Sequence, residues 1–257
     1  MPSYSIIVIF KEETLDLQHC LFSVSRAARF RDQDPDYELL TSDKPNKSLA
    51  RNDLCQIAKG DILVFLDSDA EASDSWLHEL LKPFQDPLVG VVGGCHLMKQ
   101  TASKREEMAD KILAFPLATW KSASRYKVAG KIREVDESEL TSCNLAIRKD
   151  AFLKAGGFPL DFIPCEENVL MNRIQALGYK MVYNPLAIVF HNRDELFRPH
   201  MKKIFFYAEG RGRMIRHNQG GIKFFPRPSS EFLLFGAGLI AHYTAYVSGL
   251  IWGMIKG

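Results

Sequence analysis

The sequence predicts an α/β fold in which a mostly parallel β-sheet is flanked by helices. Short apolar runs rich in β-branched residues alternate with segments of helical periodicity, a pattern typical of parallel sheets with crossover helices. Two carboxylates, Asp67 and Asp69, directly follow one of the apolar runs, "DILVFL". The 257 residues are enough to bury a large core, and a composition of 46% hydrophobic and 25% charged residues is ordinary for a globular protein.

The first hundred residues contain the alternating elements. The predicted elements are, in chain order, strand 4–10, helix 11–30, strand 37–42, helix 48–60, strand 61–67, helix 73–84 and strand 88–98. Leu15, Leu21 and Val24 recur at helical spacing in the first helix. Gly60 is expected to end the second helix, and Ser73 is expected to cap the third.

A second group of elements follows after residue 143. Residues 166–177 are predicted to form a helix that begins with Glu166 and Glu167, and residues 180–191 are predicted to be extended up to His191. Acidic residues in the first turn of a helix are favoured by its dipole. A purely structural role for the two glutamates, and packing alone for His191, are therefore the simplest interpretations.

Charge and cysteine content exclude several classes of protein. The formal net charge of +2 gives no reason to expect a nucleic-acid partner. Five cysteines are scattered and form no Cys-x-x-Cys pair, so neither a disulfide framework nor a zinc cluster is predicted, and a reducing compartment is favoured. No basic and apolar leader precedes the first strand, so we expect no signal peptide.

The C-terminal part of the chain is predicted to associate with a membrane. Residues 1–197 are expected to form the globular domain, 198–230 a basic amphipathic juxtamembrane segment, and 231–257 an apolar segment. Residues 232–255 contain no Lys, Arg, Asp or Glu and are long enough to span a bilayer. Spanning and lying in the interface both remain open, and a buried hairpin interrupted by its glycines is the alternative.

The two carboxylates after the strand predict a cation site. Ligands collect at the carboxyl ends of strands in open α/β sheets. Asp67 and Asp69 would repel each other there unless protonated or bridged by a cation, and Mg²⁺ or Mn²⁺ could bridge them and still accept substrate phosphates. The alternative is that Asp67 caps a turn and Asp69 is solvated.

Four segments together resemble a known family. "GDILVFLDSDA", "CNLAIRKDAFLKAGGF", "CEENVLMNRIQALGYKMVYNP" and "VFH" occur in this order. Their order and spacing resemble the inverting family-two glycosyltransferases of the GT-A fold, over residues 4 to about 217. The resemblance implies a transferase that moves a sugar from a UDP- or GDP-linked donor to an acceptor, with inversion at the anomeric carbon. Residues 1–197 would be the catalytic domain.

The resemblance also implies donor-binding residues. These are Phe10, Glu12, Asp43, Arg51, Asp67 and Asn144. Arg51 would face the nucleotide or the diphosphate, and Asn144 lies in the turn that approaches the donor sugar in the family. In the family's first turn, Ile9 stands in the place of Thr and Lys11 in the place of Asn.

For catalysis, the resemblance places Glu167 at the position of the base, with Glu166 before it. The family has Asp at the position of the base, whereas this chain has Glu. Asp69, Asp67 and His191 take the metal positions, with Asp69 as the direct ligand, for Mg²⁺ or Mn²⁺. A base implies a hydroxyl acceptor, on a glycan or a lipid-linked glycan. Because no Gln-x-x-Arg-Trp motif is present, we expect transfer of one or a few sugars rather than polymerisation.

Residues 199–218 resemble the helix that follows the catalytic domain in membrane-associated members. The basic residues before the apolar segment indicate that the catalytic domain faces the cytoplasm. The alternative is a solvated basic helix in which Arg211 or Arg213 contacts donor phosphates. Two other functions stay open. A degenerate, non-catalytic membrane-bound binding protein would fit the changes at Ile9 and Lys11. A nucleotidyltransferase fits less well, because the first turn has no glycine.

Overall fold

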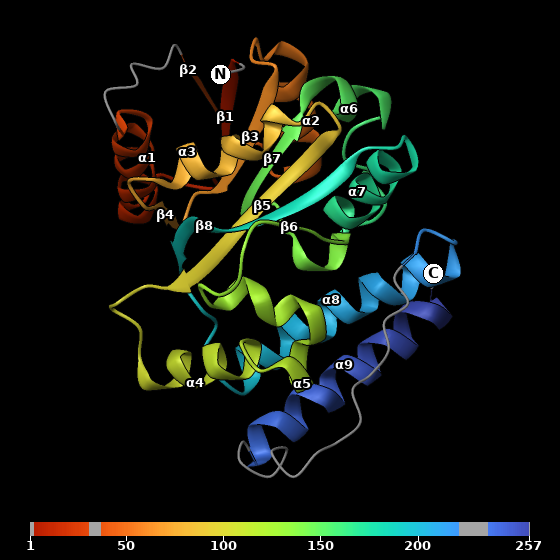
Figure 1. Cartoon of the computed structure of the whole chain (residues 1–257). Coiled ribbons are helices and arrows are strands. Elements are labelled where there is room, and N and C mark those ends of the chain that lie inside the picture. Colours follow the sequence, from red (N-terminus) through yellow and green to blue (C-terminus); the bar gives the residue numbers. More distant parts are fainter. Residues whose placement is uncertain (1–2, 31–36, 221–235, 257) are drawn as a thin grey trace.

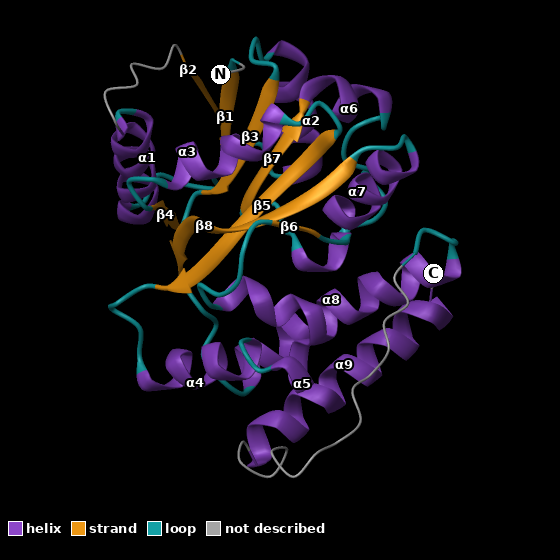
Figure 2. Ribbon diagram, in the orientation of Figure 1, coloured by secondary structure: helices purple, strands orange, loops and turns teal. Residues whose placement is uncertain are grey.

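A computed structural model describes residues 3–30, 37–220 and 236–256, with side chains described in the last range for 240–255. One β-sheet carries helices on both faces, and a further layer of helices lies beyond the end of the sheet at which the candidate site is found (Figure 1). The ribbon view separates these parts, with the strands of the sheet above and α4, α5, α8 and α9 below (Figure 2).

The sheet is mixed. Its strands are β1 (Tyr4–Ile9), β2 (Tyr37–Ser42), β3 (Ile62–Asp67), β4 (Ala70–Ala72), β5 (Val89–Met98), β6 (Arg133–Glu134), β7 (Asn144–Arg148) and β8 (Lys180–His191). The order is β2-β1-β3-β7-β5-β8-β4, and β6 pairs with β8. The expectation of a mostly parallel sheet holds for β2-β1-β3 and for β5 with β8. It is wrong for β7, which inserts antiparallel between β3 and β5, and for β4 and β6.

The helices agree with the periodicity of the sequence but not always with the predicted ends. They are α1 (Leu15–Ala28), α2 (Lys47–Ile57), α3 (Trp76–Leu81), α4 (Lys104–Leu113), α5 (Pro116–Thr119), α6 (Lys149–Lys154), α7 (Glu166–Ala176), α8 (Arg198–Arg216) and α9 (Gly236–Lys256). Short 3₁₀ helices occupy Lys82–Gln85 (η2), Trp120–Tyr126 (η3) and Glu137–Glu139 (η4). Ser73 was wrongly expected to be the N-cap of α3, because that helix begins at Trp76 with Ser75 as its cap.

The central strands are buried on both faces, which explains their continuous apolar runs. In β3, Val64 and Leu66 pack on the side of α1 and α3, in one core cluster with Val24 and Trp76. On the other face, Phe65 packs in a second cluster with α2, α6 and α7. Side chains alternate between the faces of a strand, so one run of residues supplies both cores.

The three parallel strands on one side of the sheet end together. Ile9 of β1 is in register with Ser42 of β2 and with Asp67 of β3. The loops after these strands therefore open at one edge of the sheet, as the sequence predicted for the segment around Asp67.

The two C-terminal helices pack tightly against each other. A Cβ atom on Gly212 of α8 would lie 2.3 Å from the backbone oxygen of Leu250, and one on Gly253 of α9 would lie 2.0 Å from that of Glu209. These glycines let the two helix backbones approach closely. α9 also joins α4 and α5 in a small cluster that includes Tyr243 and Leu196.

The expectation of a membrane-spanning C-terminal segment is not supported. Among the described residues, no helix combines the length and the apolar character needed to cross a bilayer. The apolar residues of α9 are interrupted by small polar residues and by glycines, of which Gly249 and Gly253 lie directly against α8. Residues 221–235, which carry the end of the predicted basic segment, lie outside the described residues.

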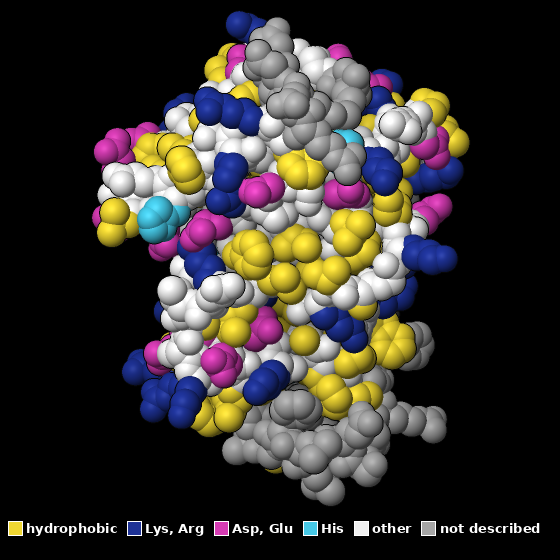
Figure 3. Space-filling model, turned by 60° about the vertical axis from the view of Figure 1, so that its left-hand side comes forward, with side chains coloured by type: hydrophobic (Ala, Val, Ile, Leu, Met, Phe, Trp, Pro, Cys, Tyr) yellow, Lys and Arg dark blue, Asp and Glu magenta, His cyan; other side chains and the backbone are white. Residues whose placement is uncertain are grey.

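The surface carries both signs of charge. On the face drawn in Figure 3, Lys and Arg side chains lie interspersed with Asp and Glu around a central group of hydrophobic side chains. This distribution agrees with the formal net charge of +2.

Candidate active site

The end of β3 and the end of β8 bring the predicted metal residues together. Asp67 is the last residue of β3, and His191 is the last residue of β8. The short strand β4 pairs antiparallel with β8, and its first residue, Ala70, is opposite His191. Asp69, directly before β4, is therefore held next to the imidazole. The sequence did not predict β4, and it is this strand that joins the Asp67–Asp69 turn to His191.

The geometry of these three side chains suits a divalent cation. Nε2 of His191 lies 3.2 Å from Oδ1 of Asp69 and 3.9 Å from Oδ2 of Asp67. Nδ1 of His191 is 2.7 Å from the backbone oxygen of Asn192 and donates its hydrogen there. A bound cation would therefore take the place of the hydrogen that Nε2 otherwise donates to Asp69. Two carboxylates and one imidazole nitrogen are a common donor set for Mn²⁺ and related ions. The residues present therefore fit the predicted metal.

The same contacts control the protonation of Asp69. Burial alone would raise the pKa of this carboxyl, but the hydrogen bond from His191 and the charge of that imidazole lower the pKa of Asp69 below its ordinary value. Asp69 is thus held as a carboxylate, the form that binds a cation.

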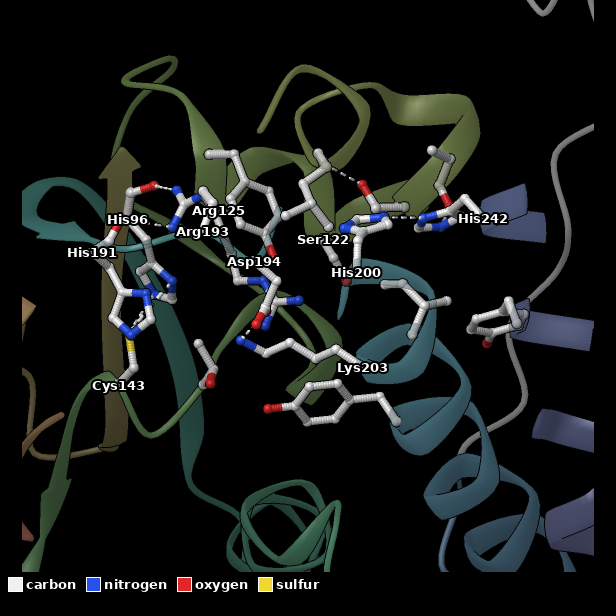
Figure 4. A pocket seen from close by; sticks show the side chains of 18 of the residues that line it. His96, Ser122, Arg125, Cys143, His191, Arg193, Asp194, His200, Lys203 and His242 are labelled. Atoms are coloured by element: carbon white, nitrogen blue, oxygen red, sulfur yellow. Dashed lines mark hydrogen bonds and ion pairs between the residues drawn. The ribbon is translucent and has the colours of Figure 1, made fainter. Parts of the chain in front are cut away.

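A cysteine that the sequence analysis did not select lies in the same place. Asp67, Cys143 and His191 each offer one possible ligand atom, and these three atoms lie within 4.8 Å of one another. The Cys143 thiol also lies 3.6 Å from Nδ1 of the fully buried His96. Figure 4 shows Cys143, His96 and His191 together at one end of a cavity. No spacing rule selects Cys143, because its partners are distant in sequence.

The predicted catalytic glutamates begin helix α7. Glu166 and Glu167 are both buried, with 8% and 7% of their surface exposed. The helix follows Cys165, whose φ of 89° is a backbone conformation that favours glycine. Thr141 lies 3.4 Å from Oε1 of Glu167 and can donate its hydroxyl hydrogen there.

Arg51 links the two acidic groups. Its Nη2 lies 3.3 Å from Oδ1 of Asp67, and its Nη1 lies 3.5 Å from Oε1 of Glu166. The guanidinium is buried and also lies over the ring of Phe158, 5.4 Å from the ring centroid. Arg51 was predicted to face the nucleotide, and it does line the cleft described below. It also forms a charge bridge between β3 and α7.

Glu166 retains a proton near neutral pH. Burial, and then the neighbouring charge of Glu167, raise the pKa of Glu166 to about 7, while Arg51 acts in the opposite direction. Below pH 7, protonation of Glu166 thus avoids a second buried negative charge beside Glu167.

Two cavities meet at this site. The first, here called the sheet-side cleft, has a volume of about 640 Å³ and lies among the loops after β1 and β2, the start of α2 and the start of α7. Its lining is Lys11, Pro45, Asn46, Lys47, Arg51, Asp67, Thr141, Ser142, Ile163, Pro164, Glu166, Glu167, Phe206 and Tyr207.

The second cavity, here called the helix-side cavity, has a volume of about 260 Å³ and extends from His191 and Cys143 to α8 and α9 (Figure 4). Both cavities are lined by Asp67, Thr141, Glu167 and Tyr207. Asp67 of the acidic pair after β3 and Glu167 of α7 thus face the same cavities, whereas Asp69 lines neither of them.

The predicted donor residues divide into two groups. Arg51 and Asp67 line the sheet-side cleft. Phe10, Glu12 and Asp43 line neither cavity, although their neighbours Lys11 and Pro45 do, and Phe10 packs partly buried against the core. A role for these three residues in donor binding remains a prediction.

Asn144 was predicted to approach the donor sugar, and this prediction is wrong. Its side chain is fully buried, its Nδ2 donates to the backbone oxygens of Cys95 and Ala187, and its Oδ1 accepts from Nε1 of Trp76. The amide links β7 to its neighbour β5, to β8 beyond it and to α3. The expectation failed because the residues just before Asn144, from Thr141 to Cys143, face the cavities instead.

The sequence patterns did not predict the helix-side cavity. Among its lining residues are Trp120, Tyr126, His200, Lys203, Tyr207, His242, Tyr243 and Tyr246. Nζ of Lys203 lies 2.7 Å from a carboxylate oxygen of Asp194, and His200 lies 3.1 Å from His242, as Figure 4 shows. These residues come from the 3₁₀ helix η3, from α8 and α9, and from the segment before α8. No local motif marks them.

Arg211 is not available to donor phosphates, contrary to one of the alternatives for the basic segment. Its guanidinium forms two hydrogen bonds of 2.8 Å with the carboxylate of Glu137, and both residues are buried. Arg213 donates to the backbone oxygen of Ile163. These contacts attach α8 to the body of the protein.

Comparison with known proteins gives one family and two curated relatives. The model of glycosyl transferase family 2 matches residues 22–156. The O-antigen biosynthesis protein RfbC of Myxococcus xanthus is 26% identical over 168 residues, which are 63% of this chain and 13% of that protein. The O-antigen chain rhamnosyltransferase RfbN of Salmonella typhimurium is 26% identical over 148 residues, 56% of this chain and 45% of that protein. The chain thus spans less than half the length of these relatives.

Two solved structures share the fold. The mannosyltransferase PcManGT from Pyrobaculum calidifontis, in complex with GDP-Man and Mn²⁺, superposes with a TM-score of 0.57 at 18% identity, covering 98% of this chain and 74% of that one. GalNAc-T7 with UDP, GalNAc and Mn²⁺ gives a TM-score of 0.52 at 15% identity, covering 98% of this chain and 56% of that one. At these identities the likeness establishes the α/β fold of the GT-A type.

Proposed function

The chain belongs to glycosyl transferase family 2, and from this premise we propose that it transfers a sugar from a nucleotide-sugar donor to a hydroxyl of a glycan acceptor, with inversion at the anomeric carbon. The observation that carries the proposal is the meeting of two cavities at Asp67 and Glu167. A transferase needs two substrates that touch at one point, and each cavity provides room for one of them.

The donor would bind in the sheet-side cleft. Lys11, Lys47 and Arg51 line this cleft, so its lining supplies positive charge for a diphosphate. The cleft also includes the start of α2, where the Asn46 side chain caps the helix and the positive end of the helix dipole favours an anion. Lys11 stands where the family usually has Asn, and its charge would compensate for the lost amide contacts.

A divalent ion such as Mg²⁺ or Mn²⁺, when held by Asp67, Asp69 and His191, would stabilise the negative charge of the departing nucleoside diphosphate. Arg51 would keep Asp67 in place through its ion pair. The solved structures of similar fold contain Mn²⁺ together with nucleotide or nucleotide-sugar, which supports this part of the proposal.

Glu167 would act as the base. It lines both cavities, whereas Glu166 lines the sheet-side cleft and lies beside Arg51. Glu167 would take the proton of the acceptor hydroxyl while the acceptor oxygen bonds to the anomeric carbon and the bond from that carbon to the diphosphate oxygen breaks. The displacement from the opposite face inverts the anomeric carbon. Assistance of this kind is worth about 10²–10⁴ in rate.

The acceptor would enter through the helix-side cavity. Trp120, Tyr126 and Tyr246 give this cavity aromatic surfaces on which sugar rings can pack. We propose that the acceptor is a glycan carried at a membrane surface on the cytoplasmic side, and that the exposed apolar residues of α9, among them Ile255, face that surface.

The proposal is tested with purified protein and a panel of UDP-, GDP- and dTDP-sugars. We expect thermal stabilisation by one nucleotide-sugar class, strengthened by Mn²⁺. Glu167→Gln should lower the turnover rate by 10²–10⁴ without weakening donor binding, because the base acts only on the acceptor.

The matched control is Glu107→Gln, which changes an exposed carboxylate in the first turn of α4 and should leave turnover unchanged. Asp69→Ala should abolish the effect of Mn²⁺ on donor binding. Full activity in both Glu167→Gln and Asp69→Ala would refute the assigned roles, and stabilisation by every nucleotide without metal would refute the metal site.

A further inference from the structure

Cys143 is placed at the metal centre by strand pairing rather than by a sequence motif. In the antiparallel pair of β3 and β7, Leu66 is opposite Asn144. The next residue along β3 is Asp67, and the residue before Asn144 is Cys143, so the carboxylate and the thiol emerge together at the edge of the sheet. The thiol faces the helix-side cavity and is 6% exposed.

Three different donor atoms therefore converge. The ligand atoms of Asp67, Cys143 and His191 lie within 4.8 Å of one another. Bonds of ~2.0–2.3 Å in a tetrahedral site would separate such atoms by roughly 3.5 Å, so binding an ion requires them to close by about 1 Å. His191 and Asp67 are only 27% exposed or less at their side chains, and the cavity leaves a fourth position open.

We propose that Cys143, His191 and Asp67 form a mixed sulfur, nitrogen and oxygen site that binds thiophilic divalent ions, Zn²⁺ above all, more tightly than Mg²⁺ or Mn²⁺. Thiolate sulfur is a soft ligand that favours Zn²⁺, whereas sites made of oxygen atoms suit Mg²⁺ and Mn²⁺. On binding, the Cys143 thiol becomes a thiolate and its proton goes to the buffer.

This inference deepens the proposed function, because Asp67 and His191 are shared with the proposed transferase metal. An ion bound through sulfur would displace Mn²⁺ from these two residues and draw Asp67 towards the thiol. Zn²⁺ would then inhibit transfer by competition with Mn²⁺. Tight binding by Cys143 and transfer of a sugar are nevertheless separate properties, so one can be absent while the other is present.

The test uses the full chain freed of metal and titrated with Co²⁺ alone. We expect a near-ultraviolet sulfur-to-cobalt charge-transfer band, which Cys143→Ser abolishes and Cys55→Ser retains. Cys55 is a matched control, since it is equally buried but lies in α2, within the core of the sheet's other face. By calorimetry, Zn²⁺ should bind more tightly than Mn²⁺, and Cys143→Ser should reduce the ratio of the two affinities at least about tenfold. The smaller preference for Zn²⁺ that nitrogen and oxygen ligands give should remain.

A measurement on the unaltered chain keeps the proposal testable if Cys143→Ser does not fold. The chemical shift of bound ¹¹³Cd reports sulfur coordination directly and should indicate one sulfur ligand. A cadmium shift typical of oxygen and nitrogen ligands alone, or a cobalt band that survives in Cys143→Ser, would overturn the inference. Neither readout depends on turnover, so failure of this inference and failure of the transferase proposal are distinguishable.

Discussion

The two cavities of the site differ in how the chain builds them. The sheet-side cleft is formed mainly by the loops after β1 and β2, the end of β3 and the starts of α2 and α7, which follow from local sequence patterns. Only Phe206 and Tyr207 of its lining come from α8. The helix-side cavity is lined largely by η3, α8 and α9, which are far apart in the chain. The first is thus mainly an extension of the sheet, and the second depends mainly on the helical layer.

A buried ion pair is one of the contacts that attach the helical layer. Arg211 of α8 and Glu137 of η4 pair through two hydrogen bonds of 2.8 Å, and Nδ2 of Asn168, next to Glu167, donates to the same carboxylate at 2.8 Å. The network thus ties α8 to the first turn of the helix that carries the proposed base. Substitutions in this network can therefore alter the helix-side cavity separately from the sheet-side cleft.

The largest effect is expected from Arg211→Met. This change removes the positive charge that compensates the buried carboxylate of Glu137, and breaking a buried ion pair in this way costs about 3–5 kcal/mol. The free energy of unfolding, measured by urea denaturation, should fall by that amount. The donor should still stabilise the folded fraction, because the sheet-side cleft does not include Arg211.

The double variant Arg211→Met, Glu137→Met is the control for this prediction. It removes both charges and should recover most of the lost free energy of unfolding. A loss below about 1 kcal/mol in the single variant would show that the ion pair does not hold the helical layer in place.

An effect of intermediate size on the free energy of unfolding is expected from Glu166, which lines the sheet-side cleft. The pKa of Glu166 is raised to about 7 by burial and by the charge of Glu167, from an ordinary value of 4.5. Between these two pH values the folded protein holds a proton that the unfolded chain has released, so the free energy of unfolding should decrease as pH rises from about 4.5 to about 7. Above pH 7 this contribution should be constant.

Glu166→Gln should remove this decrease, which is on the order of 3 kcal/mol over the pH range. The measurement is urea denaturation of both proteins at a series of pH values. Glu107→Gln, in an exposed position, should keep the slope of the original protein. Equal slopes in Glu166→Gln and the original protein would contradict the raised pKa.

The smallest effect is expected at the outer surface of the helical layer. Trp252 and Ile255 of α9 are 46% and 71% exposed, and their apolar side chains would enter the interface of a lipid surface. We expect Trp252→Ser, Ile255→Ser to weaken co-sedimentation with anionic vesicles about tenfold, or about 1.4 kcal/mol.

The matched control is Leu15→Ser, Phe22→Ser on α1, whose side chains are also exposed but lie across the molecule from α9 (Figure 1). This variant should bind vesicles as the original protein does. Equal loss in both variants would indicate non-specific hydrophobic binding, and no binding by the original protein would contradict the proposed membrane surface.

The sequence by itself determined the parts of the protein whose signals are local. A buried strand shows as a continuous apolar run and a helix as a 3.6-residue period, so β1, β3, α2 and α7 were predicted close to their observed positions. The same signals placed Asp67 at a strand end and Glu166 and Glu167 at a helix start. The order of the motifs then identified the family.

Tertiary structure decided what depends on contacts between distant residues. The direction of β7, the use of Asn144 inside the sheet, the position of Cys143 beside Asp67, and the attachment of α8 through Arg211 each require strand pairing or burial across many residues. No local period encodes such pairings, because the energy of each contact depends on the partner that folding brings to it. Helix α9 is a further example. Its composition alone suggested a membrane segment, but the structure packs its glycines against α8.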